Sequence, residues 1–287
     1  MNLFKRLFGK SYPDVGGKID LTEEQFFQRP DIARLTTQYR KTTTLLRPHL
    51  AVAPLPANSS KFGGDFDGSL LAEYPRCKAC QTPLNFVLQL YRKDFPDFYF
   101  PGNADLFQLF RCPNDDCPDA FSEQYDHVMH PFFGKADPAG SRRWIRPSMT
   151  GENLEPAISD CRLQPEQVED FPNYDDFDGD DFVNIERTYG NDWAEVFMAT
   201  CASIQRTKFG GYPSFTQSPV YRVCTCGKAK TFFFQLSSED PEDGVESPPS
   251  PDQWNPLGIM IGDVGNIYFY VCKRCGVETV ESNWDCY

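Results

Sequence analysis

One feature of this sequence constrains its fold more than any other: a phrase that occurs twice and leads each time into a pair of cysteines. The first copy reads SKFGGDFDGSLLAEYPRCKAC, and the second, 147 residues later, reads TKFGGYPSFTQSPVYRVCTCG. Phe62 and Cys77 are 15 residues apart, as are Phe209 and Cys224. Chance similarity between glycine-rich turns would not preserve this spacing, so the pattern indicates an internal duplication.

The residues common to the two copies are predicted to be structural. Each copy has a phenylalanine followed by two glycines and, further on, a glutamine inside an apolar run, FVLQL or FFFQL. Adjacent glycines let a chain turn tightly and approach another backbone, and a buried glutamine must be hydrogen bonded. These positions are Phe62, Gly63, Gly64 and Gln89 in the first copy and Phe209, Gly210, Gly211 and Gln235 in the second.

Each copy then returns to two further cysteines, so that each contains a quartet. Two cysteine pairs on neighbouring hairpin ends are typical of a structural zinc site, in which four thiolates surround the ion tetrahedrally. Two zinc ions are therefore expected. The quartets are Cys77, Cys80, Cys112 and Cys117 in the first copy, and Cys224, Cys226, Cys272 and Cys275 in the second.

Free buried thiols or a redox pair are the alternative interpretations of these cysteines. A thioredoxin-like pair would open a helix after a strand, whereas these pairs lie among β-branched and aromatic residues. Of the remaining cysteines, Cys201 shares a helical face with apolar residues and is expected to be a buried thiol.

The second copy is longer than the first between its glutamine and its last cysteine pair. It contains SSEDPEDGVESPPSPDQ, an acidic and proline-rich segment that is expected to be a surface loop. The stretch GDVGN follows, with Gly262, Asp263 and Gly265 between apolar runs, and predicts a turn. A phosphate-binding loop would need more glycines, a lysine and a following helix.

The net charge and the lack of long apolar runs indicate which partners and which location to expect. The chain has 287 residues, 40% of them apolar, and a formal net charge of −13. Such a chain attracts basic partners rather than nucleic acid. No apolar run of signal-peptide length follows MNLFKRLFGK, and no run is long enough to span a bilayer. We therefore expect a cytoplasmic protein that does not enter the membrane. In the cytoplasm, paired cysteines bind metal more often than they form disulfides.

Four regions are expected along the chain: residues 1–55 as an N-terminal helical segment, 56–130 as the first β repeat, 131–190 as a linker, and 191–287 as a helix followed by the second β repeat. Residues 21–47 are predicted to be helical, beginning with a capping box of Thr22 and Gln25. Residues 165–181 carry eight carboxylates and no lysine or arginine, and this predicts an exposed loop.

The quoted motifs resemble known families. CKACQTPLNFVLQLYRKDFPDFYFPGNADLFQLFRCPNDDC is similar to the zinc-bearing repeat of the programmed-cell-death-protein-2 and Tsr4 proteins, and TKFGGYPSFTQ with GDVGNIYFYVC is similar to the bacterial YwqG-like proteins. The resemblance implies a mainly β (α+β) fold of two pseudo-symmetric antiparallel repeats, each with a zinc-ribbon-like four-cysteine site, plus a few helices. It also implies no known enzymatic activity and, in the eukaryotic relatives, a chaperone for a ribosomal protein.

The expected function is therefore that of a non-enzymatic, zinc-stabilised protein-binding module, a chaperone or adaptor for a basic client. An immunity protein that neutralises a basic toxin is the alternative. A zinc-dependent enzyme is less favoured, because it would need a metal with an open coordination position. The three histidines and the solvated carboxylates form no catalytic constellation in the sequence.

Overall fold

The computed structural model of the chain describes residues 21–118, 129–137, 142–149, 151, 153–238, 240 and 255–287. Residues 1–20 and most of the acidic insertion, 241–254, lie outside the described residues. The helices are α2 (Glu23–Phe27), α3 (Pro30–Tyr39), α4 (Gly179–Tyr189) and α5 (Asn191–Thr200), with 3-10 helices η1 (Gly68–Leu70) and η3 (Tyr174–Asp176). The strands are β1 (Lys41–Leu50), β2 (Lys61–Phe62), β3 (Phe66–Asp67), β4 (Asn85–Tyr91), β5 (Leu106–Arg111), β6 (Met129–Gly134), β7 (Arg143–Trp144), β8 (Cys161–Asp170), β9 (Lys208–Gly210), β10 (Thr231–Ser237), β11 (Asn266–Cys272) and β12 (Gly276–Asp285).

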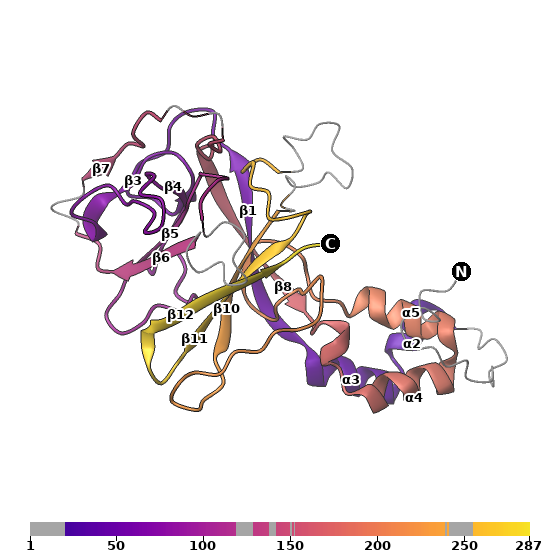
Figure 1. Ribbon diagram of the computed structural model, residues 1–287. Coiled ribbons are helices and arrows are strands. Elements are labelled where there is room, and N and C mark those ends of the chain that lie inside the picture. The colour runs from indigo at the N-terminus through magenta and orange to yellow at the C-terminus, as the bar shows by residue number, and fades with distance from the viewer. Residues whose placement is uncertain are drawn as a thin grey trace.

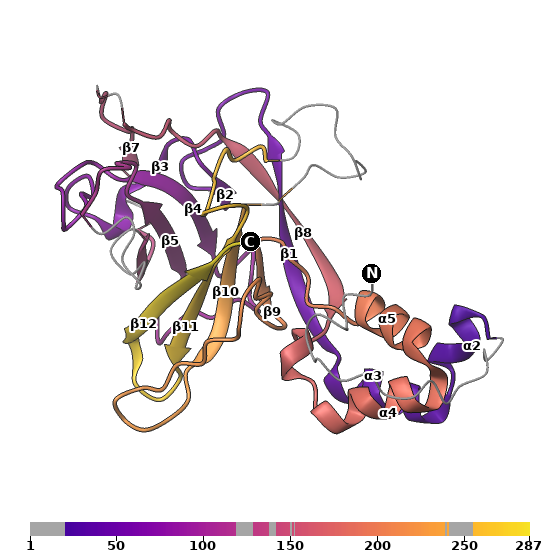
Figure 2. The ribbon, with the colours of Figure 1, turned by 45° about the vertical axis from the view of Figure 1, so that its right-hand side comes forward.

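Ten of these strands form one antiparallel sheet, which confirms the expectation of a mainly β fold. The strand order is β12-β11-β10-β9-β1-β8-β2-β4-β5-β6. The long strands β1 and β8 pair over their whole length at the centre of this order, from Lys41 opposite Asp170 to Leu50 opposite Cys161. They run side by side in both ribbon views (Figures 1 and 2). The strands of one repeat follow on each side of this pair.

The two repeats place their strands in the same order outward from the central pair. The glycine-pair strands β2 and β9 come first, then the glutamine strands β4 and β10, and then β5 and β11. The glutamine strands even share an irregularity, because the pairing register shifts around Val87 in one and Phe233 in the other, each two residues before the glutamine. The motifs that recur in the sequence thus occupy corresponding strands on the two sides of the central pair.

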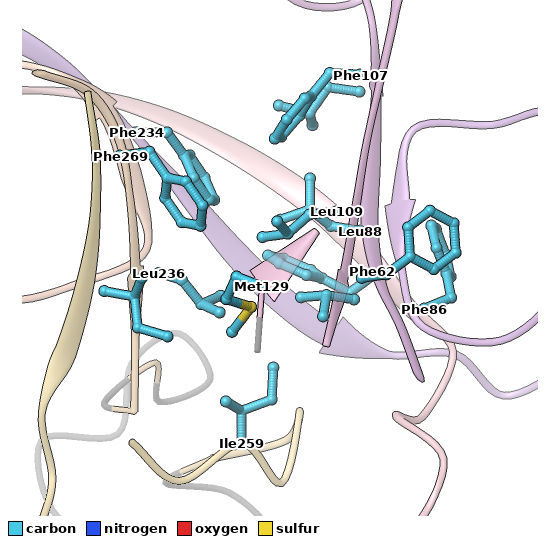
Figure 3. Close-up of a cluster of buried hydrophobic side chains, with 14 of the residues drawn as sticks. Phe62, Phe86, Leu88, Phe107, Leu109, Met129, Phe234, Leu236, Ile259 and Phe269 are labelled. Carbon is cyan, nitrogen blue, oxygen red and sulfur yellow. The ribbon is translucent and has the colours of Figure 1, made fainter. Parts of the chain in front are cut away.

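The two arms of the sheet pack against each other through a continuous apolar core. Figure 3 shows side chains of the first repeat, such as Phe107 and Leu109, facing Phe234 and Phe269 of the second. Met129 from β6 lies between the two sets. The edge strands β6 and β12 also approach each other. The repeats therefore share one core instead of forming two separate ones.

The four helices form a second unit with its own apolar core, beyond one end of the β1–β8 pair (Figure 1). The capping box of Thr22 and Gln25 is confirmed at the start of α2, and Pro30 opens α3. Cys201, just after α5, is buried as predicted. No helix in the described part of the chain is long and apolar enough to cross a membrane.

The predicted helix over 21–47 is wrong beyond Tyr39, because β1 begins at Lys41. The sequence there reads KTTTLL, and three consecutive β-branched threonines favour an extended chain. The apolar positions that suggested a helix, from Phe26 to Tyr39, lie in α2 and α3. Beyond them, β1 pairs with β8 on one side and with β9 on the other.

The loop predicted over 165–181 is also wrong at both of its ends. Strand β8 continues to Asp170, and α4 begins at Gly179 with the side chain of Asp178 as its N-cap. Most side chains of β8 are exposed, so their polarity gave no strand signal. Backbone pairing with β1, and with β2 at one end, places this polar segment at the centre of the sheet.

Candidate metal centres

The structure brings the first predicted cysteine quartet together at one end of β4 and β5. The four Sγ atoms of Cys77, Cys80, Cys112 and Cys117 all lie within 4.8 Å of one another. The Sγ–Sγ distance is 3.7 Å between Cys77 and Cys117 and 3.5 Å between Cys80 and Cys112. Cys112 directly follows β5, and Cys77 and Cys80 precede β4 in the chain. Because β4 and β5 are hydrogen bonded to each other, they bring the two cysteine pairs together.

Local backbone hydrogen bonds shape the turns that hold these cysteines. In the first turn, the amide of Cys77 donates to the carbonyl of Thr82 at 2.8 Å, and Gln81 adopts a positive φ of 61°. In the second turn, the amide of Cys117 donates to the carbonyl of Asn114 at 3.0 Å. The 112–117 loop is further tied to residues 153–155, which lie in the predicted linker.

The second quartet forms in the corresponding place of the second repeat. The Sγ atoms of Cys224, Cys226, Cys272 and Cys275 also lie within 4.8 Å of one another, with 3.7 Å between Cys226 and Cys272. The short Cys-x-Cys spacing closes because Gly227 adopts a φ of +79° and its amide donates to the carbonyl of Cys224 at 2.8 Å.

Both quartets have the geometry of a four-thiolate metal site. A tetrahedral ion with metal–sulfur bonds of about 2.3 Å places its sulfur ligands roughly 3.8 Å apart. The shortest Sγ–Sγ distances of 3.5–3.7 Å match this spacing without rearrangement. All eight thiols are free of disulfide bonds. Each quartet is therefore able to hold one metal ion.

Within each quartet the environment shifts the thiol pKa values in opposite directions. Burial raises the pKa of Cys80, but hydrogen bonds with Thr82 outweigh it and bring the pKa down to about 6, whereas burial raises the pKa of Cys112. A hydrogen bond from the backbone amide of Cys226 lowers the pKa of Cys224 to about 7, and hydrogen bonding with Cys226 and Cys224 raises that of Cys275 to about 12. Metal uptake must therefore release protons, and the affinity falls as the pH falls.

The two centres differ in their exposure. In the first quartet only Cys80 is partly exposed, and the other three thiols are buried. In the second quartet Cys226 is partly exposed and Cys275 is exposed. The first centre thus lies inside the shared core, and the second lies at the surface end of its hairpins.

The repeated glutamines anchor the glycine-pair loops from the next strand. Gln89 donates from Nε2 to the carbonyl of Ser59 at 2.7 Å and accepts at Oε1 from the amide of Asp67 at 3.2 Å. Gln235 donates to the carbonyl of Arg206 at 3.1 Å and accepts from the amide of Ser214 at 2.9 Å. Each glutamine therefore holds its loop on both sides of the glycine pair.

The glycines themselves are required by close backbone approaches. Gly63 has a φ of +55°, and a Cβ there would overlap the carbonyl of Ser159. Gly211 has a φ of +63°, and a Cβ there would overlap the carboxylate of Asp170. Phe62 and Phe209 point into the shared core, and Gly64 and Gly210 also have positive φ.

The predicted turn with Gly262, Asp263 and Gly265 leads into β11. The amide of Gly265 donates to the carbonyl of Ile261 at 2.7 Å, and the carbonyl of Asp263 accepts from the amide of Tyr287 at 3.1 Å. This turn therefore fastens the C-terminal end of the chain to the second repeat.

Sequence reasoning missed the lysine of each KFGG phrase. Lys61 and Lys208 are fully buried, and their Nζ atoms lie 2.9 Å from carboxylate oxygens of Asp160 and Asp170, respectively. The signal was present, because a lysine that occurs in both copies beside a core phenylalanine departs from the usual pattern of solvated lysines. The carboxylates could not have been assigned, since they lie far from the lysines in polar stretches.

Comparisons with known proteins identify a matching family. A search among curated proteins found no match to this sequence. A family described as a domain of unknown function, DUF1963, matches residues 60–286. The match begins just before the first KFGG phrase and ends after the last cysteine quartet, and it leaves out α2, α3 and β1. The chain therefore belongs to the DUF1963 family.

Proposed function

We propose that this protein is a zinc-stabilised, non-enzymatic binding module that holds a basic client protein in the cytoplasm. Zinc is the ion that a compact set of four thiolates suits best. A site with four protein ligands has no open position for water or substrate, which favours a structural role over a catalytic one. The family match is consistent with the YwqG-like resemblance. The similarity of the first repeat to the programmed-cell-death-protein-2 and Tsr4 proteins favours a chaperone function.

The observation that carries the client proposal is the acidic surface of η3, α4 and α5. Over residues 171–203 the chain has eight carboxylates and a single basic residue, Arg187. Asp175, Asp178, Asp180 and Asp192 are exposed there. A surface of one sign speeds the encounter with a partner of the opposite sign, and salt weakens this effect.

The test is to recover the tagged protein from its own cells at low and at moderate salt and to identify bound proteins by mass spectrometry. We expect one stoichiometric basic partner that is lost at the higher salt. A variant with Asp175→Asn, Asp178→Asn and Asp180→Asn should lose this partner while it remains folded, since asparagine is an equally good N-cap at position 178.

A variant with Asp115→Asn and Asp116→Asn is the matched control, because it removes two exposed carboxylates beside the first quartet. It should keep the partner. A partner that resists salt, or that is lost equally from both variants, would contradict binding through the helical unit.

The same acidic surface also suits an immunity protein that neutralises a basic toxin. The recovered partner separates the two functions, since a chaperone retains a cellular protein and an immunity protein retains a toxin. A toxin gene beside the gene for this chain would favour the second.

A further inference from the structure

The tip of the second metal centre differs in charge from the rest of the molecule. The quartet brings together two segments, 222–230 and 272–278. They contain five basic side chains and one acidic one, Glu278, whereas the whole chain carries a formal net charge of −13. The five are Arg222, Lys228, Lys230, Lys273 and Arg274.

Three of the five basic side chains are not neutralised within the described part of the chain. The other two, Arg222 and Lys230, lie 3.9 Å and 2.5 Å from the carboxylate of Glu281. Lys228, Lys273 and Arg274 are exposed and form no ion pair with any described residue. These three exposed cations outnumber the one exposed carboxylate of the two segments, Glu278.

Exposed apolar side chains occur in these two segments and just before the first of them. Of the ten exposed large apolar residues in the described chain, four flank these two cysteine turns in the sequence: Val220, Tyr221, Val223 and Val277. Val223, next to Cys224, has 69% of its surface exposed. Clustered exposed apolar side chains mark interaction surfaces more often than single ones do.

The first metal centre provides an internal comparison. Its turns carry Arg76 and Lys78, which are balanced by Asp115 and Asp116, and no exposed large apolar residue lies beside its cysteines within the described chain. A four-thiolate zinc site has the same charge in both repeats. The charge of the metal centre therefore does not explain why the basic and exposed apolar side chains are in excess at the second centre and not at the first.

We propose that the tip of the second pair of cysteine turns is a docking site for an acidic protein segment that carries apolar side chains. The three free cations would pair with its carboxylates, and the valines would cover its apolar residues. This surface has the opposite charge to the acidic helical unit, so it would take a second partner and does not depend on the proposed client.

A protein segment fits this tip better than a nucleic acid does. Single-stranded nucleic acids bind through aromatic stacking as well as charge, and the apolar side chains here are mainly valines. The exposed tyrosine just before the first of these segments, Tyr221, is hydrogen bonded through its hydroxyl to Asp176 of η3. The net negative charge of the molecule also opposes the approach of a long polyanion.

The test uses the full-length, metal-loaded protein and a short fluorescein-labelled peptide in which glutamate and leucine alternate. Fluorescence anisotropy gives the Kd, and amide chemical shifts map the contact. We expect shifts confined to 220–230 and 272–278. A glutamate–serine peptide and a single-stranded RNA of the same charge are the comparison probes, and both should bind more weakly.

Three variants separate charge, apolar contact and folding. The triple variant Lys228→Ser, Lys273→Ser, Arg274→Ser should weaken binding of the glutamate–leucine peptide about tenfold, because it removes three exposed charge pairs. Val223→Ser should also weaken it, and as an exposed substitution it leaves the core intact. Arg76→Ser with Lys78→Ser is the matched control at the first centre and should leave the Kd unchanged.

Metal content and circular dichroism check that each variant is folded. If the triple variant loses metal, Val223→Ser alone decides the result. Several outcomes would overturn the proposal: no binding, equal binding of the glutamate–serine peptide, undiminished binding by the variants, or tighter binding of the RNA, which would make the tip a nucleic-acid surface.

Discussion

The buried lysines of the two KFGG phrases are a matched pair with different surroundings. The Lys208 ammonium and the Asp170 carboxylate are both completely buried, and Asp170 also accepts hydrogen bonds from the amides of Ile204 and Tyr212. The partner of Lys61 is different, because the side chain of Asp160 is 18% exposed. The corresponding lysines therefore neutralise a fully buried carboxylate in the second repeat and a partly hydrated one in the first.

Lys208→Met is predicted to lower the free energy of unfolding by about 3–5 kcal/mol, since it leaves the Asp170 charge buried without its counterion. Lys61→Met should cost less, because water can still reach Asp160. Urea unfolding of both variants at neutral pH measures the difference. Equal losses would show that exposure of the carboxylate does not set the cost.

Asp240 is predicted to make stability depend on pH. Burial raises the pKa of this carboxyl from its ordinary value of 3.8 to about 7, although the amide and hydroxyl of Thr207 both donate to it. A folded pKa above the unfolded one means that the folded state holds the proton more tightly. This contribution is fully present below the unfolded pKa and is lost as the pH rises through about 7.

Asp240→Asn removes the charge; its Oδ1 can accept from the amide of Thr207, and its Nδ2 can donate to the hydroxyl oxygen of Thr207. Its free energy of unfolding relative to the wild type should therefore grow by about 2 kcal/mol between pH 5.5 and pH 8.5. Urea titrations of metal-loaded protein across this range measure the change. Glu278→Gln, at an exposed carboxylate, is the control and should give a flat difference; a flat profile for Asp240→Asn would rule out titration of Asp240.

At the scale of structural elements, the two cysteine turn pairs are predicted to differ in importance. A structural zinc contributes apparent binding energies of about 10–16 kcal/mol to folding. Cys77→Ser removes a buried ligand of the first centre and should leave the chain unfolded. Cys275→Ser removes the exposed ligand of the second centre, and we expect a folded protein that holds one zinc instead of two.

Native mass spectrometry counts the metal ions, and circular dichroism reports the fold. A stable, well-folded Cys77→Ser protein without metal in its first centre would count against a structural role for that ion. Although the second centre lies at the surface, its metal is expected to order the surrounding turns. The Cys275→Ser variant should therefore give broader amide NMR signals for residues 222–230.

At the scale of the whole molecule, Phe98 joins the two repeats. It lies in the connection between β4 and β5 of the first repeat, and its ring centroid is 5.4 Å from that of Phe209 and 6.0 Å from that of Phe233 in the second. Only 3% of its surface is exposed. The apolar core is continuous across the two arms because of such contacts.

Phe98→Ala is therefore predicted to cost about 3–5 kcal/mol and to destabilise both repeats together. Hydrogen exchange should accelerate by the same factor in β4 and β10. Phe132→Ala is the control, since this partly buried ring packs on Phe110 within its own repeat, and it should cost less. Faster exchange confined to one arm would show that the repeats unfold separately.

The features that depend on short spacing could be predicted from the sequence. The cysteine pairs, the glycine pairs and the glutamines recur at fixed offsets, and this predicted a duplicated β unit with two thiol quartets. The capping box at Thr22 was readable for the same reason, because its two hydrogen bonds join residues three apart. In each case the residues that define the feature lie in one local segment or recur in a second copy.

The centre of the sheet could not be predicted from the sequence, because its strands are paired across long stretches of chain. Strand β8 reads as polar and irregular, yet it pairs with β1 across more than a hundred residues of chain. A similar distance in sequence separates Lys61 from Asp160. Such partners are chosen by backbone hydrogen bonding and by the cost of an unpaired buried charge. Backbone hydrogen bonding and the cost of an unpaired buried charge do not depend on the periodicity of side chains along the chain. The pairings that they select therefore could not be predicted from that periodicity.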